Sequence, residues 1–275
     1  MATKHRLFDK VIIITGASSG IGRASAVRLA QSGAKLVLAA RSIDKLEVLA
    51  AGFPFPDKVL CVETDVSVEA DCKNLVEQAV ARFGGIDILV NNAGLSMRAM
   101  FKNVELKVLH RLMDVNYWGT VYCTKYALPY LLQSKGSVVG VISIAGFNGL
   151  PARSGYASSK YAIRGFLDTL RIEHLHDGLH VMVFSPGFTA SNVRIAALTA
   201  DGTPQGRTPR DESKMMSAEQ VARRLESGLV RRRACIVLTP AGRIIVKLSR
   251  VFPRISDRLT YNFMAKEPDS PFKKQ

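Results

Sequence analysis

The chain has 275 residues, of which 47% are hydrophobic and 22% are charged. This balance is ordinary for a globular protein and excludes a disordered or collagen-like chain. The formal net charge is +15, and residues 205–275 hold 16 Lys and Arg against 7 Asp and Glu. Such an excess is typical of proteins that bind nucleic acid, an anionic membrane surface or an acidic ligand. Because the excess lies in the last quarter of the chain, it does not indicate which ligand the main site binds.

The amino terminus, MATKHRLFDKVIIITG, does not have the pattern of a signal peptide, because Asp9 and Lys10 interrupt the apolar run. No stretch reaches about 18 uninterrupted apolar residues, so we expect no membrane-spanning helix and a cytoplasmic location. The cysteines form no CxxC pair and accompany no His cluster, so we expect small buried thiols and no metal site. They are Cys61, Cys72, Cys123 and Cys235.

Short apolar runs alternate with longer helical patterns along the chain. Most of the runs are continuous rather than alternating in polarity, which is typical of parallel strands buried on both faces. The expected strands are Val11–Thr15, Lys35–Ala40, Val59–Glu63, Ile86–Val90, Ser137–Ser143, His180–Ser185 and Ala234–Leu238. The expected helices include Ile21–Ser32, Ala70–Phe83, Leu106–Leu132 and Ser158–His174. The pattern predicts an α/β fold with a doubly wound sheet and helices on both of its faces.

A glycine-rich segment, TGASSGIG at residues 15–22, follows the first expected strand and opens the first expected helix. Glycines let the backbone turn sharply and approach a pyrophosphate closely. The start of a helix offers free N–H groups and a partial positive charge to an anion. The segment is therefore interpreted as a phosphate-binding turn.

Together with NNAG at residues 91–94 and YASSK at residues 156–160, this turn resembles the short-chain dehydrogenase/reductase family. The glycine spacing is GxxxGxG rather than GxGxxG, and the similarity extends from about Lys10 to Thr189, roughly two thirds of the chain. The resemblance implies a three-layer Rossmann-like domain with about seven parallel strands, placed here at residues 1–240. It also implies a nicotinamide dinucleotide and a homodimer or homotetramer.

The end of the second expected strand bears on the choice of cofactor. An acid commonly takes the ribose hydroxyls in NAD sites, but this strand ends in Ala40 and Arg41. A guanidinium pairs well with a 2′-phosphate, so NADP(H) is favoured and NAD(H) is the alternative. The second basic position of the family, just before the middle glycine, is Ser19 here, which weakens that preference.

The resemblance assigns the other cofactor contacts residue by residue. Asp65 would accept the adenine amino group beside Val66, and Thr189 would fix the carboxamide. The full set is Gly16, Ser18, Ser19, Gly20, Ile21, Gly22, Arg41, Asp65, Val66, Asn92, Ala93, Gly94, Tyr156, Lys160, Pro186, Gly187 and Thr189.

Tyr156 and Lys160 are four residues apart and so share one face of a helix. A tyrosine has a pKa of about 10 in water, and a neighbouring ammonium favours the tyrosinate. We expect Lys160 and an oxidised nicotinamide to bring this pKa toward working pH. By resemblance, Ser143 orients the substrate oxygen, and Asn116 holds a water in the proton relay.

Residues 188–216 are rich in Thr, Pro, Gly and charge, and they form a long connection that we interpret as a substrate lid. The lid carries Arg194, Arg207, Arg210 and Lys214. These cations either bind an anionic substrate or acidic carrier, or are solvated loop charges.

Residues 241–275 form a basic amphipathic extension with Pro253 as a break or second helix start. The basic face would carry Arg243, Lys247, Arg250, Arg254 and Arg258. The apolar face would carry Ile244, Leu248, Val251, Phe252, Ile255 and Leu259. Three interpretations stay open: a helix packed on the domain with a solvated basic face, a subunit interface, and a peripheral membrane contact through residues 241–264. No aromatic–basic interleaving or reading motif favours nucleic acid.

The sequence thus predicts an NADP(H)-dependent enzyme that interconverts a carbonyl and a secondary alcohol on a lipophilic small molecule, with Tyr156 as proton donor. A 3-oxoacyl-carrier-protein reductase is an alternative within the same chemistry. A non-catalytic nucleotide-binding regulatory or scaffold protein is an alternative from another class. The presence of Asn116, Ser143, Tyr156 and Lys160 argues against a silent site.

Overall fold

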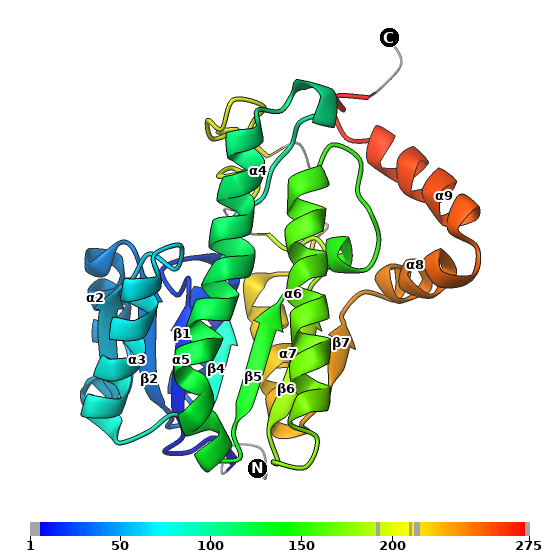
Figure 1. Cartoon of the computed structure of the whole chain (residues 1–275). Helices are drawn as coiled ribbons and strands as arrows, with labels where there is room; N and C mark the ends of the chain where they lie inside the picture. Colours follow the sequence, from blue (N-terminus) through cyan, green and yellow to red (C-terminus); the bar gives the residue numbers. More distant parts are fainter. Residues whose placement is uncertain (1–5, 191–192, 209–210, 212–214, 273–275) are drawn as a thin grey trace.

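A computed structural model describes residues 6–190, 193–208, 211 and 215–272. Seven parallel strands form one sheet, as the sequence predicts (Figure 1). Their order in the sheet is β3-β2-β1-β4-β5-β6-β7. They are β1 (Val11–Thr15), β2 (Lys35–Ala40), β3 (Val59–Glu63), β4 (Ile88–Asn91), β5 (Ser137–Val141), β6 (His180–Ser185) and β7 (Cys235–Val237). The strand order reverses between β1 and β4, and in such sheets ligands bind at the carboxyl ends of the strands beside this point.

Each face of the sheet has its own hydrophobic core, because successive side chains of a strand point to opposite faces. In β1, Val11 and Ile13 pack with α3 (Glu69–Phe83), α5 (Gly119–Gln133) and α6 (Ser154–Glu173). Ile12 and Ile14 belong to the opposite core, whose helices are α1 (Gly20–Ala30), α2 (Ile43–Ala51) and α7 (Ala218–Val230). The sheet is therefore covered on both sides, which explains why its strands are continuously apolar.

The predicted helix over residues 106–132 is interrupted. It consists of α4 (Leu106–Leu112), a π-helical turn over Met113–Trp118 and α5. Its apolar pattern continues through the turn, so periodicity alone does not reveal the change in hydrogen bonding. Such π turns insert one residue into a helix and are frequent at functional sites.

The helix that carries Tyr156 begins at Ser154, four residues before the predicted start. Tyr156 therefore lies in the first turn of α6, where its position depends on how that turn is anchored. Short 3₁₀ turns occur at Pro56–Lys58, Phe101–Asn103 and Ile144–Gly146. The other predicted boundaries agree within about two residues, the usual disagreement at element ends. Of the thiols expected to be buried, Cys72 and Cys123 are buried, but Cys235 is exposed.

The carboxyl-terminal segment forms two helices, α8 (Pro240–Val251) and α9 (Pro253–Ala265). The predicted break at Pro253 is confirmed, since α9 begins there. In Figure 1 the two helices leave the sheet after β7 as an arm that returns toward α4. We call α8 and α9 the arm.

The apolar face predicted for the arm does not pack on the domain. Ile244, Val251, Phe252, Ile255 and Leu259 are exposed, by 51% to 67%. The buried positions of the arm are Gly242, Val246, Ser256, Thr260 and Met264. One helical wheel cannot describe the arm, because Phe252 has non-helical dihedral angles and redirects the chain between the two helices.

Candidate active site

A cavity of about 1020 Å³ lies at the carboxyl ends of the strands. It runs from the glycine turn and the ends of β2 and β3 to residues of the arm. It brings together nearly all the predicted site residues, although they come from segments spread over about 170 positions. Two predicted residues, Gly22 and Asn116, do not line it. Each of these two acts by packing behind the cavity wall.

The glycine turn and the NNAG segment are tightly joined. The Thr15 hydroxyl oxygen accepts hydrogen bonds from the backbone N–H groups of Asn92 and Ala93, both at 3.0 Å. Asn92 Nδ2 donates to the Thr15 carbonyl at 2.9 Å. A Cβ on Gly22 would collide with the Gly16 carbonyl and lie 2.5 Å from Asn92 Nδ2. We call the glycine turn, residues 15–22, and the NNAG segment that supports it the glycine cradle. The glycine cradle requires glycine at position 22, and the N–H groups at the start of its helix suit a dinucleotide pyrophosphate.

Asp65 and Arg41 lie at the opposite wall of this end of the cavity. One carboxylate oxygen of Asp65 accepts hydrogen bonds from the Ser67 hydroxyl at 2.6 Å and from its backbone N–H at 3.0 Å. Burial raises the pKa of Asp65, but these hydrogen bonds and the nearby Arg41 charge outweigh it and lower the pKa. Asp65 is therefore an anionic acceptor held in one orientation. Arg41 is exposed at the rim.

Tyr156, Lys160 and Ser143 meet in the middle of the cavity. The Ser143 hydroxyl lies close enough to the phenol of Tyr156 to lower its pKa. Lys160 Nζ donates to the Val141 carbonyl at 2.9 Å and lies 5.8 Å from the centre of the Tyr156 ring. The three side chains thus converge as the sequence predicts, with Lys160 buried beneath the phenol.

Burial changes the acid–base properties of this group in a direction that the sequence does not show. It raises the pKa of Tyr156, although the Ser143 hydrogen bond and the Arg153 charge lower it in part. It also lowers the pKa of Lys160 to about 8. In the protein without its cofactor, desolvation therefore disfavours both ions. The expected lowering of the Tyr156 pKa by Lys160 together with an oxidised nicotinamide stays a prediction.

Asn116 lies fully buried in the π-helical turn rather than at the cavity surface. Its amide oxygen accepts from Leu95 N at 2.7 Å, and its Nδ2 donates to Leu95 O and to Ser159 Oγ. Its backbone carbonyl accepts from the Thr120 hydroxyl at 2.8 Å. The side chain therefore fixes the loop after β4 against α6. Its role in holding a relay water stays a prediction.

The described part of the predicted lid is fastened within itself, to the segment after α9 and to the loop after β4, where Arg98 N donates to the Leu198 carbonyl at 2.8 Å. Arg194 is buried and donates from Nη1 to the Thr189 carbonyl at 2.9 Å and from Nε to Thr208. Arg207 pairs at 3.0 Å with Asp269. Asp269 belongs to residues 266–272, which follow α9 and are called the tail. Arg194 is thus not a solvated loop charge but holds the Thr189 segment in place. Arg210 and Lys214 lie outside the described residues.

The arm forms a wall of the cavity, which the sequence analysis missed. Leu259, Thr260, Phe263 and Met264 of α9 line it, as does Ile245 of α8. Polar contacts position α9: Ser256 Oγ donates to Asn148 Oδ1 at 3.1 Å, and Asn148 Nδ2 donates to Thr260 Oγ at 2.9 Å. The four-residue spacing of Ser256, Thr260 and Met264 indicates a helical face that packs on the domain. The sequence alone did not reveal this face, because the basic residues at a similar spacing form a stronger pattern.

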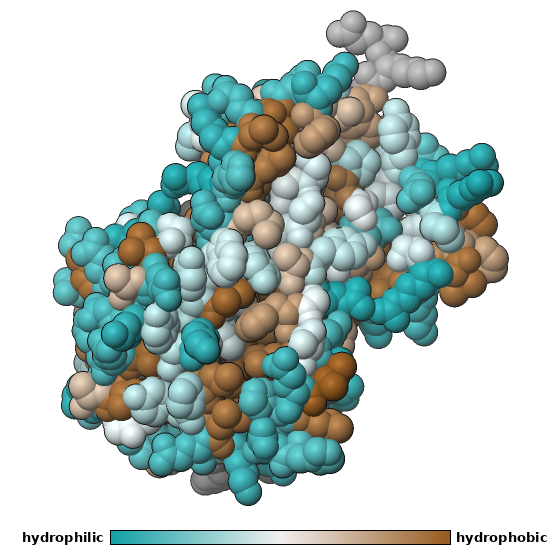
Figure 2. Space-filling view, viewed as in Figure 1, coloured by the Kyte–Doolittle hydropathy of each residue, from teal (hydrophilic) through white to brown (hydrophobic). Residues whose placement is uncertain are grey.

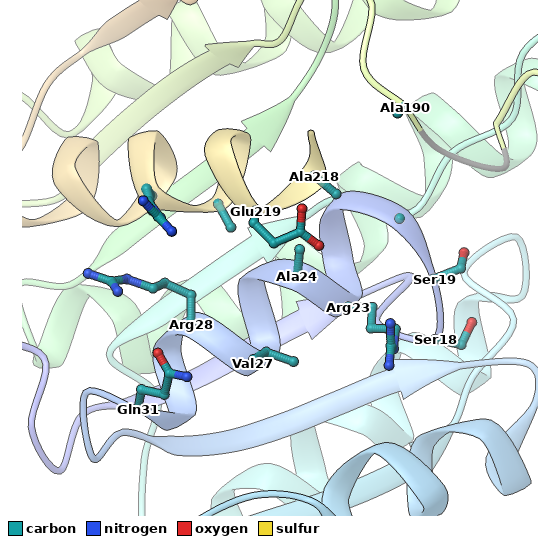
Figure 3. Close-up of a pocket in the computed structure, with 13 residues that line it drawn as sticks. Ser18, Ser19, Arg23, Ala24, Val27, Arg28, Gln31, Ala190, Ala218 and Glu219 are labelled. Atoms are coloured by element: carbon teal, nitrogen blue, oxygen red, sulfur yellow. The ribbon is translucent and has the colours of Figure 1, made fainter. Parts of the chain in front are cut away.

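A second cavity of about 620 Å³ lies between α1 and α7 (Figure 3). It borders the outer side of the glycine turn at Ser18–Gly20, and Arg23, Arg28 and Glu219 contribute to its lining. Arg28 Nε pairs with Glu226 at 2.7 Å. Arg23 lies one helical turn after Ser19, and side chains on a helix lean toward its amino terminus. Its guanidinium therefore adds positive charge beside the turn, where the family's usual cation is absent.

Within the part of the chain that the structure describes, no group of three or more His, Cys, Asp or Glu side chains could hold a metal ion. None of the described helices is both long and apolar enough to cross a membrane.

The fold, the glycine cradle and the buried Tyr156–Lys160 pair together define a dinucleotide-dependent oxidoreductase of the Rossmann type. The sequence profile described as short chain dehydrogenase matches residues 10–201. A relative from Arabidopsis thaliana, named 11-beta-hydroxysteroid dehydrogenase-like 4A, is 37% identical over 255 residues. That match covers 91% of this chain and 83% of the relative. The chain therefore belongs to the short-chain dehydrogenase family, whose members are NAD(P)-dependent oxidoreductases acting on CH–OH groups.

Solved structures agree with this assignment. A short chain dehydrogenase/reductase from Burkholderia phymatum in complex with NAD superposes with a TM-score of 0.79 at 25% identity, over 90% of this chain and 95% of that one. An alcohol dehydrogenase from the archaeon Thermococcus sibiricus, complexed with 5-hydroxy-NADP, gives a TM-score of 0.71 at 26% identity. That match covers 83% of this chain and 95% of the other.

Proposed function

We propose that the protein is an NADP(H)-dependent reductase or dehydrogenase that interconverts a bulky apolar carbonyl compound and its secondary alcohol. The convergence of Ser143, Tyr156 and Lys160 in one cavity with the glycine cradle carries this proposal. The bound nicotinamide supplies or accepts the hydride. The chain's own residues supply the proton and the orientation.

The direction of the pKa shifts assigns roles to these residues. Because burial raises the pKa of Tyr156, the phenol is protonated near neutral pH and donates its proton to the alkoxide that forms during carbonyl reduction. Ser143 lies beside this phenol and orients the carbonyl oxygen between the two hydroxyls. Lys160 lies buried beside them. There its charge favours the tyrosinate left after proton transfer, and its ammonium would hold the nicotinamide ribose of a bound cofactor.

Arginines at the nucleotide end support a preference for NADP(H). Arg41 lines the cavity at the end of β2 and no acid takes its place. Arg23 adds a second cation at the outer side of the turn (Figure 3). Glu219 is the negative charge that opposes Arg23. The hydrogen bond with Ser217 lowers the pKa of Glu219 most, and the charge of Arg23 lowers it further. NAD(H) remains the alternative cofactor.

The lining of the substrate end supports an apolar substrate. Phe188, Val193 and Leu150 face the cavity from the domain, and Leu259 and Phe263 face it from the arm. Two of the four lid cations, Arg194 and Arg207, are engaged with protein groups, which disfavours an acidic carrier protein. The Arabidopsis relative is named for a hydroxysteroid, and a bulky polycyclic or similarly apolar alcohol would suit this wall.

The test follows NADPH absorbance with a panel of apolar ketones, small ketones and a 3-oxoacyl carrier protein. We expect turnover of bulky apolar ketones, and a loss of about a hundredfold or more in Tyr156→Phe with unchanged NADPH binding. An equally active Tyr156→Phe variant would contradict the role of the phenol. Turnover of the carrier-bound substrate alone would favour the acyl reductase.

We also propose that two or more copies associate through the outer face of α5 and α6. That face exposes Trp118 at the start of α5, and Tyr161 and Ile172 on α6. Figure 2 shows apolar and weakly polar side chains along the middle of this face. A dimer or tetramer by sedimentation, converted to monomers by Trp118→Glu with Tyr161→Glu, is the expected result. A monomeric wild type would overturn it.

The exposed apolar side chains of the arm support a further proposal, a peripheral contact with an anionic membrane surface by a protein that is otherwise cytoplasmic. Val251, Phe252 and Ile255 are more than half exposed at the bend between α8 and α9, and Arg250 and Arg254 flank them. Apolar insertion and basic charge together favour anionic lipid.

Co-sedimentation with vesicles tests this contact. We expect binding to vesicles that contain an anionic phospholipid, weaker binding to neutral vesicles, and loss of binding in Phe252→Asp. Val48→Asp, at an exposed apolar position on α2, is the matched control and should bind as the wild type does. Equal binding by Phe252→Asp would contradict the contact.

A further inference from the structure

A buried ion cluster joins the tail to both loops that border the substrate end of the cavity. The Glu267 carboxylate, with a side chain only 1% exposed, accepts from Arg153 Nη2 at 3.2 Å through both oxygens. Its Oε2 also lies 3.4 Å from Arg98 Nε. Arg98 follows β4 and Arg153 precedes α6, and each side chain is 9% exposed. We call Glu267, Arg98 and Arg153 the clamp.

The clamp also fixes the backbone of the tail. Arg98 Nη2 donates to the carbonyl oxygens of Pro268 and Asp269 at 2.8 and 3.0 Å. A single arginine therefore holds both the Glu267 side chain and the two following peptide groups. Because Glu267 follows α9 by two residues, this anchor sets where the cavity wall formed by α9 ends.

Arg153 occupies the first position before α6, and Tyr156 lies in the first turn of that helix. Helix N-termini carry a partial positive charge, so a guanidinium is unfavourable there unless an anion accompanies it. The first turn, Ser154–Ala157, contains no acidic residue. A carboxylate from a position more than a hundred residues away supplies the missing anion.

We propose that Glu267 is a positioning residue for Tyr156: by holding Arg153 and Arg98 it anchors the first turn of α6 and closes the substrate end of the cavity with the arm. The inference deepens the proposed function and rests on it. The groups that act on the phenol are Ser143 after β5, Arg153 before α6 and Lys160, which lies one helical turn after Tyr156. Of these, Arg153 is the group that Glu267 controls.

The clamp predicts opposite effects of its two charges on the phenol. Glu267→Gln keeps the shape of the side chain but removes the negative charge that Arg153 contacts, so the tyrosinate is favoured. Arg153→Leu removes the cation, so the neutral phenol is favoured. With saturating oxidised cofactor, the midpoint of the pH profile for alcohol oxidation is expected to move to lower pH in Glu267→Gln and to higher pH in Arg153→Leu.

The kinetic and exchange readouts complete the test. Glu267→Gln is expected to lower kcat for carbonyl reduction about tenfold and raise the carbonyl KM about fivefold, with the NADPH KM within twofold of the wild type. Backbone amides of residues 154–158 should exchange faster in the cofactor-free variant. Glu267→Asp should recover at least half of the lost kcat, and Asp257→Asn, at an exposed acid on α9, should behave as the wild type.

Each outcome decides the matter. If both charge variants shift the pH midpoint in the same direction, or neither does, Glu267 has only a structural role. If Glu267→Gln does not fold, Arg98→Gln replaces it. A shift of the midpoint to higher pH, smaller than that of Arg153→Leu, then supports the clamp, and no shift overturns it. If the wild type turns over no alcohol and no carbonyl, the proposed function fails. An active wild type with an identical Glu267→Gln variant overturns the clamp alone.

Discussion

The two ends of the long cavity are built in different ways. At the nucleotide end, the glycine turn and the NNAG segment are joined by short hydrogen bonds between side chains and the backbone, as in those between Thr15 and residues Asn92 and Ala93. At the substrate end, side chains from three remote segments meet, as Phe188 meets Phe263 at 6.1 Å between ring centres. The first end tolerates almost no change of residue size, whereas the second can be altered one side chain at a time.

The largest expected effect lies at the nucleotide end. Gly22→Ala would place a methyl group against the Gly16 carbonyl and Asn92 Nδ2, so the turn must move away from its position. We expect cofactor affinity to fall about a hundredfold or more, which corresponds to about 2.7 kcal/mol. Isothermal titration with NADPH measures it. Gly165→Ala is the matched control, because nothing lies within 4 Å of its added Cβ, and a wild-type affinity in both variants would remove the contrast.

Arg41→Ala tests the outer part of the same end, where a side chain rather than the backbone would contact the cofactor. Loss of a charge-assisted hydrogen bond of about 1.5–3 kcal/mol predicts a rise of roughly ten- to a hundredfold in the KM for NADPH. The KM for NADH should stay within twofold. Equal changes for both cofactors would show that Arg41 does not distinguish them.

The pKa of Lys160 predicts a pH dependence at the point where the two ends meet. Lys160 is cationic below its lowered pKa of about 8 and neutral above it. Because kcat/KM for NADPH reports the free enzyme, it should be level below pH 8 and fall by up to about tenfold per unit above it. Lys160→Met should show a low value without this decline. A wild-type profile level to pH 10 would contradict a charged Lys160 in cofactor binding.

The smallest expected effect lies at the arm. Phe263 is 52% exposed and lines the cavity, so Phe263→Ala removes only part of its apolar contact with a substrate. We expect the KM of a bulky apolar ketone to rise about fivefold, since partial loss of an aromatic contact costs about 1 kcal/mol. The KM values of a small ketone and of NADPH should not change. Phe252→Ala, 55% exposed but away from the cavity lining, is the control.

The same difference explains what the sequence could predict. The sheet, the turn and the grouping of Ser143 with Tyr156 and Lys160 follow from local patterns, since the carboxyl ends of parallel strands share one edge. The arm's place in the cavity wall could not be predicted, because it depends on distant contacts such as those of Asn148 with Ser256 and Thr260. Burial also decides pKa values, so the raised pKa of Tyr156 required the structure.

The apolar pattern of the arm shows a related limit. A helical wheel assigns one face to solvent and the other to the core only while the helix continues, and here it ends at Val251. After Pro253, the buried positions are Ser256, Thr260 and Met264, whereas Ile255 is exposed and Leu259 and Phe263 are about half exposed at the edge of the cavity. Sequence periodicity does not tell a face that packs on the chain itself from one that lies against another surface.

The arm joins the rest of the chain only after β7, the last strand at the edge of the sheet. A relative could therefore exchange or lengthen these two helices without disturbing the sheet, as long as the contact of Glu267 with Arg153 is kept. Diversity in the alcohols accepted would then accumulate in the final segment of the chain, while the hydride chemistry is inherited unchanged.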